Sequence, residues 1–441
     1  STDRFLTSWG VKQAVDIEQP ARVKIRGIKL DIMDQEMSKS QKVRIQYASK
    51  YARVSNYWKY FIGQSEQLVK NKVFDKKQKI ENSFITWYKN NELDKTYSES
   101  LSLIENALKN SSKYTIPKVY FQEAVVGSEL ILFMLRNLSP RTPLFKALSS
   151  GEGIKDAKDN FLKVAESFYK DYNATIDENT LAAVLSLYAN DVPKEFQPEL
   201  LISLNDKYKG DFKKVASNYF KKSPFKSYDL FKAWLTSDKL SVKMIEKDLV
   251  YQLKNEFLDV YRAKVMTPNS AFDSDYKKGM RLFVDGLQKM GMNKASDANS
   301  TMRFTYGNVL SYNPADAVHY DFYTTLEGVM EKEVITEDKN HEFYVPQKLK
   351  DLYYAKDFGP YARKEDGKLP VGFLSNNDIT GGNSGSPVIN AHGELIGTAF
   401  DGNWEAMSGD IYFEPNIQRT ISVDVRYTLF IIDKYAGATL N

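Results

Sequence analysis

The chain has 441 residues, of which 42% are hydrophobic and 27% charged, which is enough to form two or three domains. Its formal net charge is only +4, and the two signs are interspersed, so the sequence gives no electrostatic reason to expect nucleic acid or a membrane surface as a partner. The absence of cysteine excludes thiolate catalysis, and three histidines make a histidine-rich metal site unexpected. We therefore expect no metal and no cofactor.

Residues 1–27 are predicted to contain strands. Val11, Ala14 and Val15 are spaced as strand residues are, and Val23 and Ile25 follow Pro20 with a period of two. The start of the chain has no basic segment followed by an apolar one, so either the protein is cytosolic or its true N-terminus is missing from this sequence.

Residues 28–299 are predicted to form a helical domain of roughly ten helices joined by short links. Apolar residues recur there at spacings of three and four, as in the stripe Leu181, Val184, Leu185 and Tyr188. The stretch Thr175-Ile-Asp-Glu178 has the pattern of a capping box that opens this helix. The apolar run 129–136 is far shorter than the about 20 residues that span a bilayer, so it predicts a buried helix.

The period changes to two in residues 300–441. Residues 302–312 and 395–400 are predicted to be strands, and glycine- and asparagine-rich turns separate such segments. Residues 423–434 are predicted to be a last strand that runs into a C-terminal helix.

The stretch Thr380-Gly-Gly-Asn-Ser-Gly-Ser-Pro387 carries a candidate nucleophile, Ser384. A serine hydroxyl needs a base to take its proton and hydrogen-bond donors for the oxyanion that forms on the attacked carbonyl. Glycines permit a tight turn that directs two N–H groups into one site, so those of Gly382 and Ser384 are the candidate oxyanion hole. The alternative is a simple hairpin loop, because Gly, Asn and Ser are the usual turn residues.

A strand, a turn and a second strand follow Ser384, the order found after the nucleophile of a trypsin-like peptidase. Longer stretches then resemble the bacterial dipeptidyl-peptidase 7 and 11 family of serine exopeptidases. They are the stretch that begins at Asp378, Gly397-Thr-Ala-Phe-Asp-Gly-Asn-Trp-Glu405, Gln418-Arg-Thr-Ile-Ser-Val-Asp-Val-Arg-Tyr427 and Tyr47-Ala-Ser-Lys-Tyr-Ala-Arg-Val-Ser-Asn-Tyr-Trp-Lys59.

The resemblance, closest to dipeptidyl-peptidase 7, implies an α+β fold with a trypsin-like double β-barrel and a helical domain inserted between the barrels. Residues 1–27 would end the first barrel, 28–299 would form the helical cap, and 300–441 would form the C-terminal barrel with its helix. The family's catalytic histidine and aspartate lie on the first barrel, so the chain is expected to be a C-terminal portion that is inactive alone. A homodimer and an extracytoplasmic location in a bacterium are also implied.

The three histidines lie outside the segment in which the family has its base. His319 and His341 belong to the predicted second barrel, and His392 lies in a turn. A strand-face or solvent-exposed histidine is the preferred interpretation for each.

The resemblance also implies a substrate: a peptide with a free N-terminus, cut after its second residue. Asp401 would bind the substrate ammonium group by charge-assisted hydrogen bonds, and Asn56 would assist. Gly402 matches the position where the acidic-specific branch of the family has arginine, so the residue before the cleaved bond should be apolar or aromatic. The alternatives are a turn aspartate for Asp401 and a helix-packing or solvated residue for Asn56.

Two other functional classes stay open at this point. The chain could be a peptide-binding or scaffold protein that kept a peptidase-like barrel without catalysis, as a missing base would permit. It could also be a helical interaction module to which the barrel is a passive attachment.

Overall fold

The computed structural model describes residues 3–292, 301–335, 339 and 341–438. These residues divide into two compact units. The helical unit comprises Thr7–Ser65 and Phe74–Met292, and the sheet unit comprises the described residues of Ser1–Leu6, Glu66–Val73 and Asn293–Asn441. The predicted boundary near residue 300 lies partly outside the described residues.

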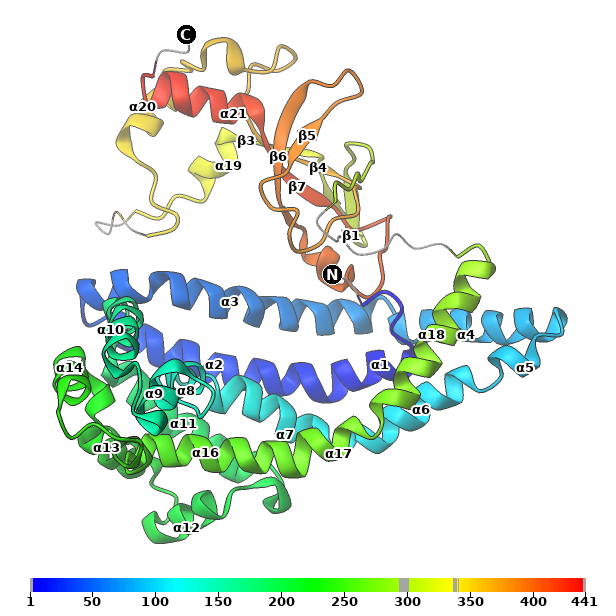
Figure 1. Cartoon of the computed structure of the whole chain (residues 1–441). Helices are drawn as coiled ribbons and strands as arrows, with labels where there is room; N and C mark the ends of the chain where they lie inside the picture. Colours follow the sequence, from blue (N-terminus) through cyan, green and yellow to red (C-terminus); the bar gives the residue numbers. More distant parts are fainter. Residues whose placement is uncertain (1–2, 293–300, 336–338, 340, 439–441) are drawn as a thin grey trace. The chain divides into compact units, whose positions relative to one another are not determined.

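Figure 1 shows the helices coloured along the chain, with α2 and α3 running alongside each other. The first eleven are α1 (Ser8–Gln13), α2 (Gln19–Met37), α3 (Gln41–Lys70), α4 (Val73–Asn90), α5 (Asp94–Tyr97), α6 (Ser100–Ser111), α7 (Thr115–Tyr120), α8 (Glu129–Asn137), α9 (Pro143–Ser150), α10 (Ile154–Lys170) and α11 (Ala174–Asp191). The next seven are α12 (Glu199–Tyr208), α13 (Phe212–Lys222), α14 (Tyr228–Thr236), α15 (Val242–Glu246), α16 (Leu249–Val260), α17 (Thr267–Ser270) and α18 (Asp273–Lys289). The helical class is confirmed, but the helices are shorter and more numerous than roughly ten.

The core of the helical unit is built from the apolar stripes that the sequence shows. Leu181, Val184, Leu185 and Tyr188 on α11 are all at most 1% exposed. Aromatic rings from α8, α10 and α14 meet in the same core, with the ring of Phe161 5.6 Å from Phe133 and 5.1 Å from Phe231, centroid to centroid. Burial of one such side chain stabilises the fold by about 1.5–3 kcal/mol, so packing accounts for the helical arrangement.

The apolar helix α8 has a buried charge at each end. The carboxylate of Asp177 accepts hydrogen bonds from the N–H groups of Glu129 and Leu130, both at 2.8 Å, and the ammonium group of Lys254 donates to the carbonyl of Leu138 at 3.0 Å. A negative charge at the N-terminus and a positive charge at the C-terminus of a helix both complement its dipole. Burial raises the pKa of Asp177 to about 6 and lowers that of Lys254 to about 8.

Two sequence predictions for the helical unit are wrong. The residues predicted as strands between Val11 and Ile25 lie in α1, α2 and the π-helical turn Ala14–Glu18 between them. This turn directly precedes Pro20, whose missing N–H would break a regular helical ladder. The predicted capping box is also absent, because Asn173 and not Thr175 is the N-cap of α11, and the side chain of Asn173 accepts from the N–H groups of Thr175 and Ile176.

The sheet unit contains seven strands in two antiparallel sheets. They are β1 (Tyr312–Ala315), β2 (Val318–Tyr320), β3 (Tyr323–Thr325), β4 (Pro370–Ser375), β5 (Pro387–Ile389), β6 (Leu395–Gly402) and β7 (Thr420–Asp424). β1 pairs with β2, and the other five are ordered β3-β4-β7-β6-β5. The larger sheet is open, because its edge strands β3 and β5 do not pair with each other within the described residues. The closed trypsin-like barrel therefore stays a prediction.

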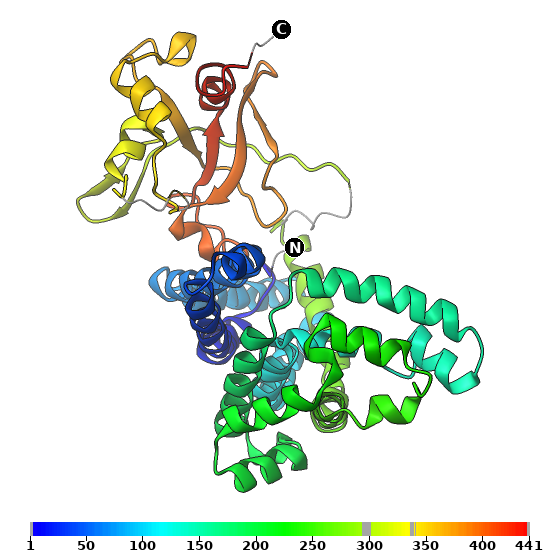
Figure 2. The same ribbon diagram turned by 90° about the vertical axis from the view of Figure 1, so that its left-hand side faces the viewer.

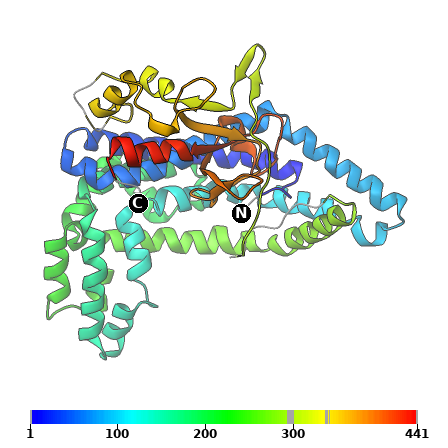
Figure 3. The ribbon, with the colours of Figure 1, turned by 90° about the horizontal axis from the view of Figure 1, so that it is seen from above.

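Three helices accompany the strands: α19 (Leu326–Glu331), α20 (Gln347–Tyr354) and α21 (Val425–Phe430). Figure 2 shows α21 lying against the sheet, and Figure 3 shows it continuing directly from β7. Phe430 on α21 and Leu326 on α19 are fully buried in a small apolar cluster. The predicted strand followed by a C-terminal helix is confirmed.

The other strand predictions have mixed outcomes. Residues 395–400 form most of β6, as expected. Of residues 302–312, only Tyr312 belongs to a strand, and Val309 makes a single bridge to Ser375. The rest has no regular secondary structure and is mostly solvent-exposed, with Phe304 80% and Tyr306 93% exposed, so alternating apolar residues here do not indicate a buried sheet face.

Candidate functional site

The loop that carries Ser384 lies between β4 and β5 in the sheet unit. Gly382 and Gly385 flank the serine with φ angles of +108° and +86°, conformations that residues with a Cβ rarely adopt. Asn383 closes the turn, since its side-chain oxygen accepts from the N–H of Thr380 at 3.1 Å and its own N–H donates to the carbonyl of Thr380 at 3.2 Å. The sequence therefore holds Ser384 at the tip of a tight, exposed turn.

The loop is attached to β6 through both backbone groups of Ala399. The N–H of Gly385 donates to the carbonyl of Ala399 at 2.8 Å, and the N–H of Ala399 donates to the carbonyl of Ser386 at 3.0 Å. The hydroxyl of Ser384 donates to the carbonyl of Phe400 at 3.2 Å. Among the described residues, the N–H groups of Gly382 and Ser384 donate to no protein acceptor, so both are available to a ligand.

A β-bulge lies in β6 next to this contact. Ala399 pairs with Ser422 and Asp401 with Ile421, so Phe400 is the extra residue. Bulges often re-aim side chains beside active sites. Asp401 is exposed at the strand end, and its carboxylate accepts from the N–H of Gly402 at 2.8 Å. The geometry leaves the second oxygen of Asp401 free for a charged ligand group in the described structure.

Gly402 lies where there is little room for a side chain. A Cβ built on Gly402 would approach the Cβ of Ala406 to 2.9 Å, closer than real Cβ atoms come. Ala406 belongs to the short 3-10 helix Trp404–Ser408, which follows β6 directly. A larger residue at 402 therefore requires this turn to move or residue 406 to shrink.

None of the three histidines bonds to Ser384 in the described part of the chain. His319 lies exposed on β2, with its Nδ1 2.9 Å from the side-chain oxygen of Asn313. His341 Nδ1 accepts from the N–H of Phe343 at 3.1 Å, and His392 is exposed in the hairpin turn between β5 and β6. The proposed nucleophile therefore has no general base bonded to it here.

Asn56 belongs to the other unit. It is exposed on α3, in the part of that helix that groups with the helical unit. The sheet unit thus brings together Ser384, Gly382, Asp401 and Gly402 along one loop and one strand, whereas the role of Asn56 stays a prediction.

Sequence reasoning missed the polar residues that hold the end of β6. Asn403 and Glu405 come just after Asp401 and Gly402, the residues proposed to bind the substrate. Both are buried, as are Tyr312 and Arg419. The sequence signal was present but weak: polar residues at strand ends are usually exposed, so burial of several of them could only be recognised in three dimensions.

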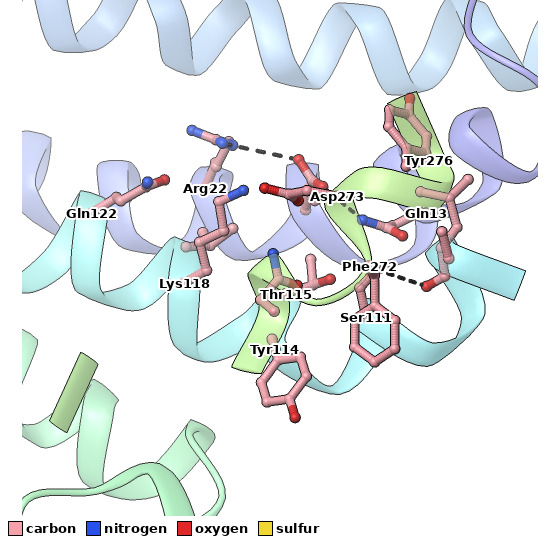
Figure 4. Close-up of a pocket in the computed structure, with 15 residues that line it drawn as sticks. Gln13, Arg22, Ser111, Tyr114, Thr115, Lys118, Gln122, Phe272, Asp273 and Tyr276 are labelled. Atoms are coloured by element: carbon pink, nitrogen blue, oxygen red, sulfur yellow. Dashed lines mark hydrogen bonds and ion pairs between the residues drawn. The ribbon is translucent and has the colours of Figure 1, made fainter. Parts of the chain in front are cut away.

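The helical unit has a separate cavity of about 190 Å³, shown in Figure 4. Side chains from α2, α6, α7 and α18 line it, including Arg22, Lys118 and Asp273. The hydroxyl of Ser111 in this cavity donates a hydrogen bond to the carbonyl of Leu108 at 3.1 Å. Arg22 forms ion pairs with Glu18 and Glu123. The cavity offers no activated nucleophile, so it is not the candidate catalytic site.

Within the described ranges, no group of three or more His, Asp or Glu side chains is arranged to hold a metal ion. The described helices also include none that is both long and apolar enough to cross a membrane.

Comparison with known proteins gives matches along the whole chain. The peptidase S46 family pattern matches residues 1–440. Dipeptidyl-peptidase 7 of Porphyromonas gingivalis is 42% identical over 99% of this chain and 60% of its own length, and an Asp/Glu-specific dipeptidyl-peptidase of Flavobacterium psychrophilum is 38% identical over the same shares. The crystal structure of Porphyromonas endodontalis DPP11 with the dipeptide Arg-Asp superposes with a TM-score of 0.87 at 33% identity, over 99% of this chain and 61% of that one.

The chain thus spans about 60% of the length of the curated relatives that it matches. The predicted resemblance to the dipeptidyl-peptidase 7 and 11 family is confirmed, since the relatives include proteins named dipeptidyl-peptidase 7 and Asp/Glu-specific dipeptidyl-peptidase. The chain belongs to the peptidase S46 family.

Proposed function

We propose that the chain is part of a serine dipeptidyl-peptidase that removes dipeptides from the free N-terminus of peptides. The observation that carries the proposal is the Ser384 turn, in which Gly382 and Gly385 have positive φ angles and the serine is exposed. Among the described residues, the N–H groups of Gly382 and Ser384 have no protein acceptor. Such a turn suits attack by the serine and stabilisation of the oxyanion. The names of the relatives support the substrate class.

The mechanism in this proposal is acyl transfer. Ser384 Oγ attacks the carbonyl of the second substrate residue, the peptide bond breaks with release of the shortened peptide, and water then hydrolyses the acyl-enzyme. The attack requires a base, and no histidine of this chain bonds to Ser384 in the described residues. We infer that the base comes from sequence outside these 441 residues, in a double-barrel arrangement such as the resemblance implies.

The substrate ammonium group would bind Asp401, because a carboxylate forms charge-assisted hydrogen bonds with it. Asp401 lies one residue beyond Phe400, whose carbonyl holds the Ser384 hydroxyl, so the amine anchor and the nucleophile are on neighbouring backbone. Asn56 would add a second contact. Cleavage after two residues would follow from this fixed separation.

The residue before the cleaved bond would be apolar or aromatic, because Gly402 offers no cation to pair with a carboxylate. The test is Gly402→Arg, together with Ala406→Gly to remove the 2.9 Å contact between Cβ atoms. The double variant should prefer aspartate or glutamate at that position, and Ala406→Gly alone is the matched control. An unchanged substrate profile in a folded double variant would remove Gly402 from the specificity pocket.

The deciding experiment uses the full native polypeptide that contains this chain. A fluorophosphonate should label the protein, and Ser384→Ala should abolish both labelling and dipeptide release, while Ser386→Ala controls for a serine of the same loop. Absence of labelling would favour the peptide-binding or scaffold alternative, and cleavage of internal bonds would refute the exopeptidase part. The chain of 441 residues alone should show no activity.

The resemblance also supports a homodimer and an extracytoplasmic location in a bacterium. Light scattering of the native protein and fractionation of the producing cell would test these two predictions.

A further inference from the structure

A cluster of buried polar side chains surrounds the end of β6, next to Asp401 and Gly402, which are proposed to bind the substrate. Asn403, Glu405, Arg419 and Tyr312 are exposed by 6%, 7%, 4% and 9%. They come from three separate segments of the sheet unit: the start of β1, the turn after β6, and the residue before β7. Burying so many polar groups is unfavourable unless each has a hydrogen-bond partner.

Asn403 uses every hydrogen-bonding group that it has. Its N–H donates to the carbonyl of Arg419 at 3.0 Å, and its side-chain oxygen accepts from the N–H of Arg419 at 2.8 Å. Its side-chain nitrogen donates to Glu405 Oε2 at 3.0 Å and to the carbonyl of Ile417 at 2.8 Å, and its carbonyl accepts from the N–H of Ala406 at 2.9 Å. Five bonds fix both the backbone and the side chain of the residue that follows Gly402.

Glu405 completes this arrangement as an acceptor. Its Oε2 receives one hydrogen bond from Asn403 and a second from the hydroxyl of Tyr312 at 3.1 Å. Burial raises the pKa of Tyr312 to about 12, so its hydroxyl is protonated at neutral pH and can donate. Without Glu405, two buried donors would lose their acceptor, which costs more than the bonds themselves contribute.

Arg419 does not serve as the counter-ion for Glu405 in this cluster. Its guanidinium instead donates to main-chain carbonyls, which belong to Leu310, Ser311, Pro415, Asn416 and Gln418. Five N–H groups thus tie the segment before β1 to the loop before β7. A buried carboxylate that is satisfied by neutral donors indicates a role in geometry rather than in charge balance.

The Ser384 loop and the cluster make hydrogen bonds to the chain on either side of residues 400–402. Ala399 is bonded to Gly385 and Ser386 of the loop, and Asn403 is bonded to Arg419 and Glu405. Between Ala399 and Asn403 lie only the bulged residue Phe400 and the two residues proposed to bind the substrate, Asp401 and Gly402. We propose that Asn403, oriented by Glu405, is a positioning residue that sets the distance of Asp401 from Ser384; this inference rests on the proposed function.

The test compares Glu405→Gln with Glu405→Met in the full native polypeptide. Glutamine keeps an oxygen acceptor at the same reach, whereas methionine fills a similar volume and accepts no comparable bond. For a fluorogenic dipeptide substrate with a free amine, Glu405→Met should raise KM about tenfold with a smaller change in kcat, because a misplaced anchor weakens substrate binding first. Glu405→Gln should stay within about twofold of the wild type, and Glu365→Met, at an exposed glutamate of the same unit, is the control.

Two further readouts separate positioning from simple stabilisation. The preference for the free-amine substrate over its N-acetylated form should fall in Glu405→Met, whereas the rate of fluorophosphonate labelling of Ser384 should not change, since that reagent needs no amine anchor. If Glu405→Met does not fold, Tyr312→Phe removes one donor and should give the same pattern more weakly.

Three outcomes would overturn the inference. Unchanged KM and amine preference in folded Glu405→Met would show that the cluster only stabilises the fold. Loss of labelling in parallel with activity would show that it supports the serine loop instead of Asp401. A wild-type protein that is neither labelled nor active would refute the proposed function, and the inference would fall with it.

Discussion

In the helical unit, rings such as Phe133, Phe161 and Phe231 pack into a continuous apolar core, whereas in the sheet unit the proposed site is held by hydrogen bonds from Asn403 and Arg419. Among the described residues of the sheet unit, a small apolar cluster surrounds Leu326 and Phe430, and several large apolar side chains are exposed. We therefore expect the stability of the helical unit to depend mainly on the volume of its buried side chains, and that of the sheet unit mainly on hydrogen-bond geometry.

The largest expected effect tests the packing side of this contrast. Phe231 is fully buried and contacts Phe161 and Trp234. Phe231→Ala should lower the free energy of unfolding by about 3–5 kcal/mol, through lost burial and the cavity left behind. Urea denaturation followed by circular dichroism measures it. A loss below about 1 kcal/mol would mean that the helical core is not close-packed.

The pH dependence of stability tests the buried carboxylate of Asp177 in the helical unit. Burial raises the pKa of Asp177 from 3.8 to about 6, so the folded state holds this proton more tightly than the unfolded state. Its contribution to stability is full below about pH 3.8 and is lost as the pH rises through about 6. The difference in unfolding free energy, wild type minus Asp177→Asn, should therefore fall by up to about 3 kcal/mol between about pH 4 and pH 7.

The same urea titrations at both pH values check this prediction. For Asp159→Asn, at an exposed aspartate of α10, the difference in unfolding free energy from the wild type should not fall in this way as the pH rises. A difference for Asp177 that grows with pH would show that the bonds from Glu129 and Leu130 outweigh burial.

A substitution of Arg419 tests how much hydrogen bonds contribute to the stability of the sheet unit. Arg419→Lys keeps the positive charge but replaces a planar group with five donors by a single ammonium group. Several of the five carbonyls would lose their donor, and the unfolding free energy should fall by about 2 kcal/mol. Thermal unfolding measures the loss, and Arg363→Lys is a control, because the Arg363 guanidinium lies over the ring of Tyr323 in the same unit. Equal effects at the two positions would remove the special role of Arg419.

The smallest effect is expected where apolar side chains are exposed. Met302, Phe304 and Tyr306 are exposed by 78%, 80% and 93%. Replacing all three by serine should change the unfolding free energy by less than about 0.5 kcal/mol, because no buried surface is lost. A loss above about 1 kcal/mol would show that these side chains are covered in solution.

Much of the helical unit could be predicted because its signals are local. Residues spaced by three and four, such as Leu181 and Leu185, are buried as their spacing indicates. The first helices were missed because a π-helical turn and Pro20 disturb the regular period. The cap at Asn173 was missed because Thr175 and Glu178 have the spacing of a capping box, although the helix begins at Ala174.

The Ser384 turn could be recognised in the sequence because glycine marks positions that need a positive φ angle. The support for Asp401 and Gly402 could not. Tyr312 and Glu405 are 93 residues apart, and Arg419 reaches the carbonyl of Leu310 over 109 residues. Contacts over such separations leave no periodic trace, so only the folded chain reveals them.

The close approach of residues 402 and 406 bears on how substrate preference can change during evolution. A side chain at 402 requires room that the Cβ of Ala406 occupies, and alanine can become smaller only as glycine. An arginine introduced first would displace the turn that carries Asn403, whereas glycine at 406 would open the space beforehand. The order of the two substitutions therefore matters: a change in specificity at residue 402 is most accessible after a silent step at residue 406.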